Sequence, residues 1–282
     1  MIYDKRKVLL VKNVKLSQKL TESGLMLALT TILSLLAIVK LPYGGSITFA
    51  SMLPMIIVAY RYGFVWGMLT GATYGLIQML IGMDTLSYAT SAGAVVAIIL
   101  LDYIFAFMAT ALGGAFRKSA NQVASLTNAA LVVCALRYLF HVISGCTVWA
   151  GLSIPTADAL IYSIVYNATY MLPETIITCV AAVYLSSSLN FRTKHLTAAK
   201  SGKAPKAVNI MTAVSGLIIL GAVAAIVAMV FSKLQNPETG EFDIRGIYQV
   251  NAPVLAIIAG ATVAVVAVMY CISRSVIRKQ EK

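Results

Sequence analysis

Long apolar runs dominate this 282-residue sequence and restrict what it can fold into. A helix needs about 20 mainly apolar residues to cross the hydrocarbon core of a bilayer. Seven runs have about that length or more, and a shorter one, broken by Pro54, makes an eighth. They lie at about 22–39, 46–60, 64–82, 91–115, 122–147, 158–189, 208–231 and 251–273. Charged residues make up 11% of the chain, against about 25% in a soluble domain. The sequence therefore predicts an all-α, polytopic protein of the lipid bilayer.

The basic residues are distributed by topology rather than gathered in one patch. If all eight segments cross the membrane, 18 of the 22 Lys and Arg residues lie on one side. Because cytoplasmic loops carry the excess of positive charge, both termini are predicted to be cytoplasmic, in a cell membrane protein. The net charge of +12 therefore does not indicate nucleic-acid binding. Two interpretations of residues 1–20 are open: a segment that lies along the inner membrane surface, or a solvated basic tail.

Composition divides the chain into four parts. The basic segment 1–20 precedes a first helix that we expect to be retained, because the apolar run lacks the small-residue cleavage site of a signal peptide. A membrane core is expected over 21–195, a polar and basic linker over 196–207, and two further hydrophobic helices with a basic tail over 208–282. The four cysteines form no CxxC pair and only two histidines are present, so we expect no disulfide, metal site or cofactor.

Small residues recur at helical spacing in two places. Gly63, Gly67, Gly71 and Gly75 follow one another at every fourth position, which predicts a helix face that a neighbouring helix approaches closely. Gly24 and Ala28 form a shorter version of the same pattern on the first helix. For this second pair, packing within the chain and docking of a partner protein are both open.

Three ionisable residues, Asp102, Arg137 and Glu174, lie in the middle of apolar segments. A charge at the bilayer centre costs about 2.5–3.5 kcal/mol even on an insertion scale, so such residues are expected to have a partner or a ligand. Counted from the ends of their helices, Arg137 and Glu174 lie at a similar depth. We therefore expect them to form a structural ion pair.

Asp102 is then left with His141 as the remaining cationic partner, and aromatic residues occur at a similar depth, among them Tyr103, Trp149 and Tyr162. A carboxylate among aromatic rings suits a cationic, ring-bearing ligand, since each cation–π contact contributes about 0.5–2 kcal/mol. His141 and Asn167 add hydrogen-bonding groups. The alternative is a buried polar network around Asp102, with the aromatic residues in the interfacial belt. The residue chemistry alone leaves both open.

No motif in the sequence indicates catalysis. A Walker GxxxxGK[ST] loop is absent, so the chain does not hydrolyse ATP through that motif. Asp102, His141 and Ser144 superficially match a hydrolytic triad, but Ser144 lacks the strand-to-helix context of a nucleophile elbow. We therefore expect the protein not to be an enzyme.

Five motifs carry a resemblance to a known family. They are LPYGGSITFASMLP over 41–54, Tyr60-Arg-Tyr-Gly63, Leu101-Asp-Tyr103, Arg137-Tyr-Leu-Phe-His141-xxx-Gly145-xxx-Trp149, and Tyr162-Ser-Ile-Val-Tyr-Asn167. Together they cover about residues 20–195, and the chain over that range resembles the thiamine-specific substrate-binding membrane subunits of energy-coupling factor (ECF) transporters. The last two motifs in tandem are the most specific.

The resemblance implies a six-helix subunit that captures thiamine near the outer surface, with the two C-terminal helices as an extension. Its partners would be a transmembrane coupling protein, which docks on Gly24 and Ala28, and two ABC-type ATPases that power uptake. The implied thiamine contacts are Tyr74, Asp102, Tyr103, His141, Gly145, Trp149, Tyr162 and Asn167.

Two features depart from the family pattern. Some members have a glutamate at the position of Asp102 and a tryptophan at that of Gly45, and the helices at 208–231 and 251–273 lie outside the family core. The leading hypothesis is a thiamine-capturing subunit of an ATP-driven importer. A proton-coupled or facilitative carrier of a cationic, vitamin-like solute, with Asp102 and Glu174 as protonatable sites, is the alternative.

Overall fold

The computed structural model describes residues 14–118, 121–151, 156–199, 206–234 and 244–280. The chain divides into two compact units, residues 1–199 and 200–282, each of which is considered by itself. Of the basic N-terminal segment expected over 1–20, residues 1–13 lie outside the described residues, and the first helix begins at Leu16. Residues 200–205 of the expected linker also lie outside them.

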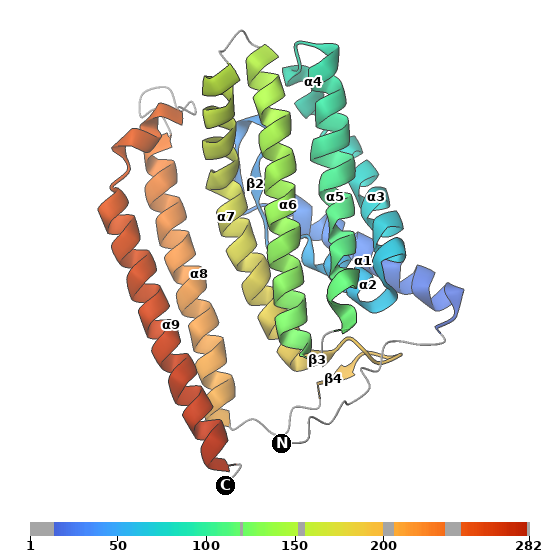
Figure 1. Ribbon diagram of the computed structural model, residues 1–282, viewed down its shortest axis with the longest axis vertical. Coiled ribbons are helices and arrows are strands. Elements are labelled where there is room, and N and C mark those ends of the chain that lie inside the picture. Colours follow the sequence, from blue (N-terminus) through green and yellow to red (C-terminus); the bar gives the residue numbers. More distant parts are fainter. Residues whose placement is uncertain (1–13, 119–120, 152–155, 200–205, 235–243, 281–282) are drawn as a thin grey trace. The chain divides into compact units, whose positions relative to one another are not determined.

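Unit 1 is helical apart from two short hairpins (Figure 1). In chain order its elements are α1 (Leu16–Leu35), β1 (Val39–Lys40), η1 (Pro42–Gly44), β2 (Ser46–Ile47), α2 (Leu53–Tyr62), α3 (Phe64–Ile81), η2 (Met83–Tyr88), α4 (Ala92–Ala97), η3 (Ile98–Phe105), α5 (Ala106–Met108), η4 (Ala109–Lys118), α6 (Gln122–Gly151), α7 (Thr156–Ser188), β3 (Leu189–Asn190) and β4 (Thr197–Ala198). The stretch from α4 to η4 forms one membrane-crossing segment whose middle, η3, is wound as a π-helix.

Unit 2 is a pair of helices, α8 (Lys206–Leu234) and α9 (Ala252–Gln280), with a short helical turn η5 (Ile244–Gln249) before α9. The Ser215 hydroxyl reaches the Met269 sulfur and the Ser273 hydroxyl reaches the Met211 sulfur, so the two helices run antiparallel. Most of their apolar surface is exposed, as lipid-facing helices require.

Six helices of the described chain are long and apolar enough to cross a membrane: α3, the α4–η4 segment, α6, α7, and the apolar stretches Ala213–Leu234 and Ala252–Ser273. These helices confirm the expectation of an all-α, multi-pass membrane protein. The first two expected segments require correction. Helix α1 ends at Leu35 rather than at residue 39 and is not among the six, because polar residues such as Glu22, Thr30 and Ser34 interrupt its apolar character.

The second expected segment, 46–60, is helical only from Leu53, because its first residues pair as a strand. Val39 pairs with Ile47 and Lys40 with Ser46, which forms an antiparallel hairpin around η1. Helix α2 then follows, and all ten of its residues are buried. It is an internal helix of the protein rather than a lipid-facing one.

The glycine stripe on α3 lets the α4–η4 segment approach closely, as its spacing predicts. A Cβ atom on Gly71 would lie 2.6 Å from the Phe107 carbonyl oxygen, and one on Gly75 would lie 2.5 Å from that of Tyr103. Real Cβ atoms do not come so close to backbone oxygens. The stripe therefore positions η3, which carries Asp102, against α3.

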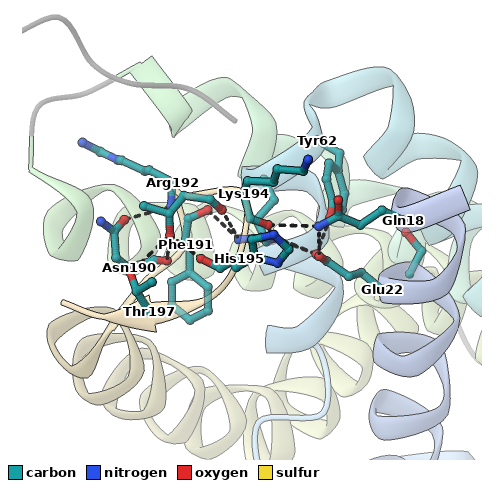
Figure 2. A network of polar contacts seen from close by, with 12 residues as sticks. Gln18, Glu22, Tyr62, Asn190, Phe191, Arg192, Lys194, His195 and Thr197 are labelled. Atoms are coloured by element: carbon teal, nitrogen blue, oxygen red, sulfur yellow. Dashed lines mark hydrogen bonds and ion pairs between the residues drawn. The ribbon is translucent and has the colours of Figure 1, made fainter. Parts of the chain in front are cut away.

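A polar network ties the start of α1 to the β3–β4 hairpin (Figure 2). The Arg61 guanidinium, which is 2% exposed, lies 2.9 Å from the Glu22 carboxylate and donates to the Phe191 carbonyl at the same distance. The Tyr62 hydroxyl donates to Glu22 as well, and the Gln18 amide reaches the Lys194 carbonyl at 3.0 Å. A buried guanidinium needs such partners, so this network fixes one end of the bundle.

Candidate functional site

A cavity of about 380 Å³ lies in unit 1, between the β1–β2 hairpin, η2, η3, α6 and α7. Ionisable, amide and aromatic groups converge on it. The lining residues used below are Tyr43, Gly45, Ser46, Tyr88, Asp102, Tyr103, Arg137, His141, Gly145, Tyr166, Asn167 and Tyr170. A cavity of this size, with a few convergent polar groups, is typical of a small-molecule site.

Asp102 is the carboxylate of this cavity. Its two oxygens accept hydrogen bonds from α6, one from His141 Nδ1 at 2.7 Å and one from the Ser144 hydroxyl at 2.8 Å. The side chain of Asp102 keeps 26% exposure, so its carboxylate is still accessible from the cavity. Asp102 lies within the π-helical stretch η3, a distortion that occurs frequently at functional sites. The expected proximity of Asp102 and His141 is therefore present.

Helix α7 supplies an amide and two phenols to the opposite wall. The Asn167 amide nitrogen donates to the His141 carbonyl at 3.2 Å and to the Ser163 carbonyl at 2.8 Å, and its oxygen accepts from the Tyr170 hydroxyl at 2.5 Å. Gly145 lies where α6 meets α7, and a Cβ atom there would come within 2.5 Å of Ser163 Oγ. Gly145 thus lines the cavity and also permits the close contact of the two helices.

A row of aromatic rings extends from the hairpin to His141. Adjacent ring centroids are 4.9 Å apart for Tyr88 and Tyr43, 6.1 Å for Tyr43 and Tyr166, 5.7 Å for Tyr166 and Tyr170, and 6.4 Å for Tyr170 and His141. Such spacings suit edge-to-face aromatic pairs. The row gives the cavity the electron-rich faces that a flat cationic ring would contact.

The hairpin is attached to α7 through Tyr166. Its hydroxyl donates to the Pro42 carbonyl and accepts from the Gly45 N–H at 3.0 Å. Tyr43 and Gly44 adopt left-handed backbone conformations, with φ of 64° and 92°, which reverse the chain in the turn. Sequence reasoning did not assign Tyr43, Tyr88, Tyr166 or Tyr170 to the site. The spacing of Tyr166 and Tyr170, which places both on one face of α7 with Asn167 beside them, was the available signal.

The remaining expected ligand contacts differ in where the structure places them. Tyr103 lines the cavity, and its hydroxyl donates to the Gly82 carbonyl at 2.8 Å. Among the described residues that line the cavity, neither Tyr74 nor Tyr162 is present. Tyr74 is buried behind the wall, with its ring edge-on to Phe107 and its hydroxyl directed at the Thr30 carbonyl. Trp149 belongs to α6, but its side chain lies outside the described residues.

The expected ion pair between Arg137 and Glu174 is not formed among the described residues. Glu174, on α7, instead accepts from the backbone N–H and the hydroxyl of Thr48. Arg137 lines the cavity, with its guanidinium 5.0 Å from the centroid of the Phe107 ring and 3.4 Å from His141 Nε2. The two residues were expected at a similar depth, but depth predicts neither the direction of a side chain nor a contact. The two side chains leave their helices toward different neighbours.

The described residues contain no group of three or more His, Cys, Asp or Glu side chains that could hold a metal ion. The chemistry that the cavity offers is therefore that of one accessible carboxylate, an imidazole, a guanidinium, an amide and several aromatic rings. Membrane-spanning helices around such a cavity give the protein an internal site of the kind that holds a small molecule.

The comparisons with known proteins specify the family. The model of the thiamine transporter protein family (Thia_YuaJ) matches residues 20–193, which is more than half of the chain, and the chain belongs to this family. The thiamine transporter ThiT of Bacillus subtilis is 32% identical over 179 residues, covering 59% of this chain and 89% of that protein. The solved structure of ThiT from Listeria monocytogenes is 24% identical, with a TM-score of 0.48 over 60% of this chain and 92% of that one.

Proposed function

We propose that this protein is the substrate-binding membrane subunit of an ECF-type importer and that it captures thiamine in the cavity described above. The observation that carries the proposal is Asp102, an accessible carboxylate in a cavity lined by aromatic rings, in a chain of the thiamine transporter family. Thiamine combines a cationic thiazolium with an aminopyrimidine. A countercharge and ring faces are the groups that recognise such a ligand.

The proposed roles of the residues follow from their positions. Asp102 supplies the countercharge, while His141 holds one of its oxygens and presents a ring face. Tyr103, Gly145 and Asn167 form the surrounding wall. Stacking of the ligand on Trp149 stays a prediction. Tyr74 is proposed to act from behind the lining residues, because it is buried and the cavity wall does not include it. Contact of the ligand with Tyr162 stays a prediction.

The energy for uptake is proposed to come from partner subunits, a transmembrane coupling protein and two ABC-type ATPases. Gly24 and Ala28 are both exposed on α1, and a Cβ atom on Gly24 would meet nothing within 4 Å. This open small-residue face supports the proposal that α1 docks on the coupling protein. Both termini are proposed to be cytoplasmic, as the distribution of basic residues indicates.

Thiamine binding to the purified, detergent-solubilised protein tests the first part of the proposal. We expect saturable binding by titration calorimetry and weaker binding in Asp102→Asn. Thiamine should also quench tryptophan fluorescence, and the quench should be lost in the Trp149→Phe variant, which keeps Trp66. The amide of Asp102→Asn keeps the shape but loses the countercharge, and a charged hydrogen bond contributes about 1.5–3 kcal/mol. Unchanged affinity in this variant would remove Asp102 from the site.

Uptake in cells tests the partnership. Accumulation of thiamine should be lost when the ATPases are deleted and should persist in the presence of a protonophore. The opposite pattern would favour the proton-coupled carrier over the ECF subunit.

A further inference from the structure

Glu174 is a buried carboxylate whose role the proposed ligand contacts do not explain. Its side chain is 2% exposed, and each of its two oxygens accepts a hydrogen bond from Thr48. Thr48 donates its backbone N–H to one oxygen at 2.6 Å and its hydroxyl to the other at 2.7 Å. Hydrogen bonds to a charged acceptor are among the strongest in proteins, so Glu174 attaches α7 firmly to the residue that follows β2.

The hairpin that ends at Thr48 forms part of the cavity wall. Gly45 and Ser46 line the cavity, three and two positions before Thr48. A Cβ atom on Gly45 would come 2.7 Å from the Tyr166 hydroxyl oxygen and 2.9 Å from the Tyr170 ring. The backbone of the hairpin therefore packs directly on the phenols of α7, and a small displacement of the hairpin would change the shape of the cavity.

One face of α7 holds the hairpin at two levels. Tyr166, Tyr170 and Glu174 follow one another at every fourth position, which places them on one stripe of the helix. Tyr166 bonds the turn at Pro42 and Gly45, and Glu174 bonds Thr48 two helical turns farther along. Figure 1 shows β2 beside α7. The turn and the end of the hairpin thus have separate attachments to the same helix.

Thr48 also connects to the start of α2. Its hydroxyl lies 2.9 Å from the Ser51 hydroxyl and accepts from the Ser51 N–H at 3.3 Å. The Ser51 carbonyl in turn accepts from the Thr30 hydroxyl on α1. Glu174 therefore acts on a short polar chain that joins α7, the end of the hairpin, and α1.

From these contacts we infer that Glu174 is a positioning residue for the ligand cavity, which acts through Thr48 by holding Gly45 and Ser46 in the cavity wall. The inference rests on the proposed function, because it takes thiamine as the ligand. Loss of the Glu174–Thr48 contact is expected to let the hairpin separate from α7 and to release bound thiamine faster. A role in folding alone would lower stability without changing the dissociation rate of the folded protein.

Four single variants of the full-length protein test the inference. Glu174→Ala removes both hydrogen bonds and Thr48→Val removes the hydroxyl donor alone. Glu174→Gln keeps an oxygen for the Thr48 N–H and offers an N–H to the Thr48 hydroxyl oxygen. Thr178→Val is the matched control, because Thr178 is buried on the same helix and its hydroxyl has no hydrogen-bond partner. Dissociation of thiamine is measured by stopped-flow fluorescence after mixing with excess unlabelled competitor.

We expect dissociation to be about ten- to a hundredfold faster in Glu174→Ala, as the strength of hydrogen bonds to a charged group implies. Thr48→Val and Glu174→Gln should show smaller accelerations, since the first keeps the backbone N–H donor and the second keeps the contacts without the charge. Thr178→Val should resemble the wild type. Thiamine should dissociate from the double variant Glu174→Ala with Thr48→Val no faster than from Glu174→Ala, since both changes remove the same contact. A wild-type rate in Glu174→Ala, or a Glu174→Gln variant as fast as Glu174→Ala, would overturn the inference.

A second measurement separates failure of this inference from failure of the proposed function. Hydrogen exchange of peptides covering 39–52, measured without thiamine, should be faster in Glu174→Ala and Thr48→Val than in Thr178→Val. If the wild type does not bind thiamine, the proposed function fails, and this measurement still tests the attachment. If Glu174→Ala is not recovered folded, the Thr48→Val variant tests the inference in its place. Hydrogen exchange and a thiamine dissociation rate that both match the wild type in Thr48→Val would contradict the inference.

Discussion

At the residue scale, the ionisable side chains of the membrane segments differ in the partners they find: His141 bonds Asp102, and Thr48 bonds Glu174. Asp102 and His141 were expected to be neighbours and are hydrogen-bonded. Arg137 and Glu174 were expected to pair and do not, because depth along a helix does not determine the direction in which a side chain points. The partner of Glu174 is a backbone N–H and a hydroxyl of Thr48, in a segment whose strand pairing the hydrophobic pattern did not predict.

Gly145 provides a prediction at this scale. Gly145→Ala should weaken thiamine binding and lower thermal stability, because the new methyl group would lie 2.5 Å from Ser163 Oγ and push α6 from α7 at the cavity. Overpacking of this kind costs about 1–3 kcal/mol. Adding Ser163→Ala removes the opposing oxygen and should restore part of both properties. Thermal unfolding and calorimetric titration measure them, and a double variant no better than Gly145→Ala would locate the effect elsewhere.

At the scale of the element, apolar run length predicted the long helices closely. The expected segment 64–82 is helix α3 over Phe64–Ile81, and 122–147 and 158–189 correspond to α6 and α7. The hairpin around η1 and the π-helical winding of η3 were not predicted, because both depend on contacts with distant segments rather than on local hydropathy. Those two irregular elements carry Gly45 and Asp102, so the least predictable elements are among those that line the cavity.

The glycines of two helices provide a matched pair of substitutions. Gly71→Ala in α3 should destabilise the protein, because its Cβ atom would lie 2.6 Å from the Phe107 carbonyl oxygen. Gly221→Ala in α8 should be neutral or slightly stabilising, since nothing lies within 4 Å of its Cβ position and alanine is favoured over glycine in a helix by about 1 kcal/mol. Thermal unfolding in detergent compares the two, and equal effects would contradict the close packing of α3.

At the scale of the whole molecule, the cavity belongs to one unit. Every described residue that lines it lies between Ser34 and Tyr170, within unit 1, and the family match ends at residue 193. Composition predicted an additional helix pair after a polar linker, but it gave no indication of what that pair does. No described residue of unit 2 lines this cavity, so the role of the helix pair requires a measurement.

Truncation after Ala199 is that measurement. We expect the protein comprising residues 1–199 to bind thiamine with the affinity of the full chain, because none of the described residues that it lacks lines the cavity. Calorimetric titration of both proteins in the same detergent makes the comparison, with Asp102→Asn in the shortened chain as a control for specific binding. A large loss of affinity in a folded, truncated protein would assign unit 2 a part in ligand capture.

The complete burial of α2 bears on how the protein is inserted. At 1.5 Å per residue, its ten residues extend about 15 Å, roughly half of the hydrocarbon thickness. The hairpin before it has backbone N–H and C=O groups that are not hydrogen-bonded within a helix. Such groups occur at membrane depth only where protein surrounds them. Residues 36–62 therefore cannot leave the translocon as an independent span. The bonds from α7 to the hairpin form only after α7 has been synthesised, so biogenesis of this protein joins segments synthesised far apart in time.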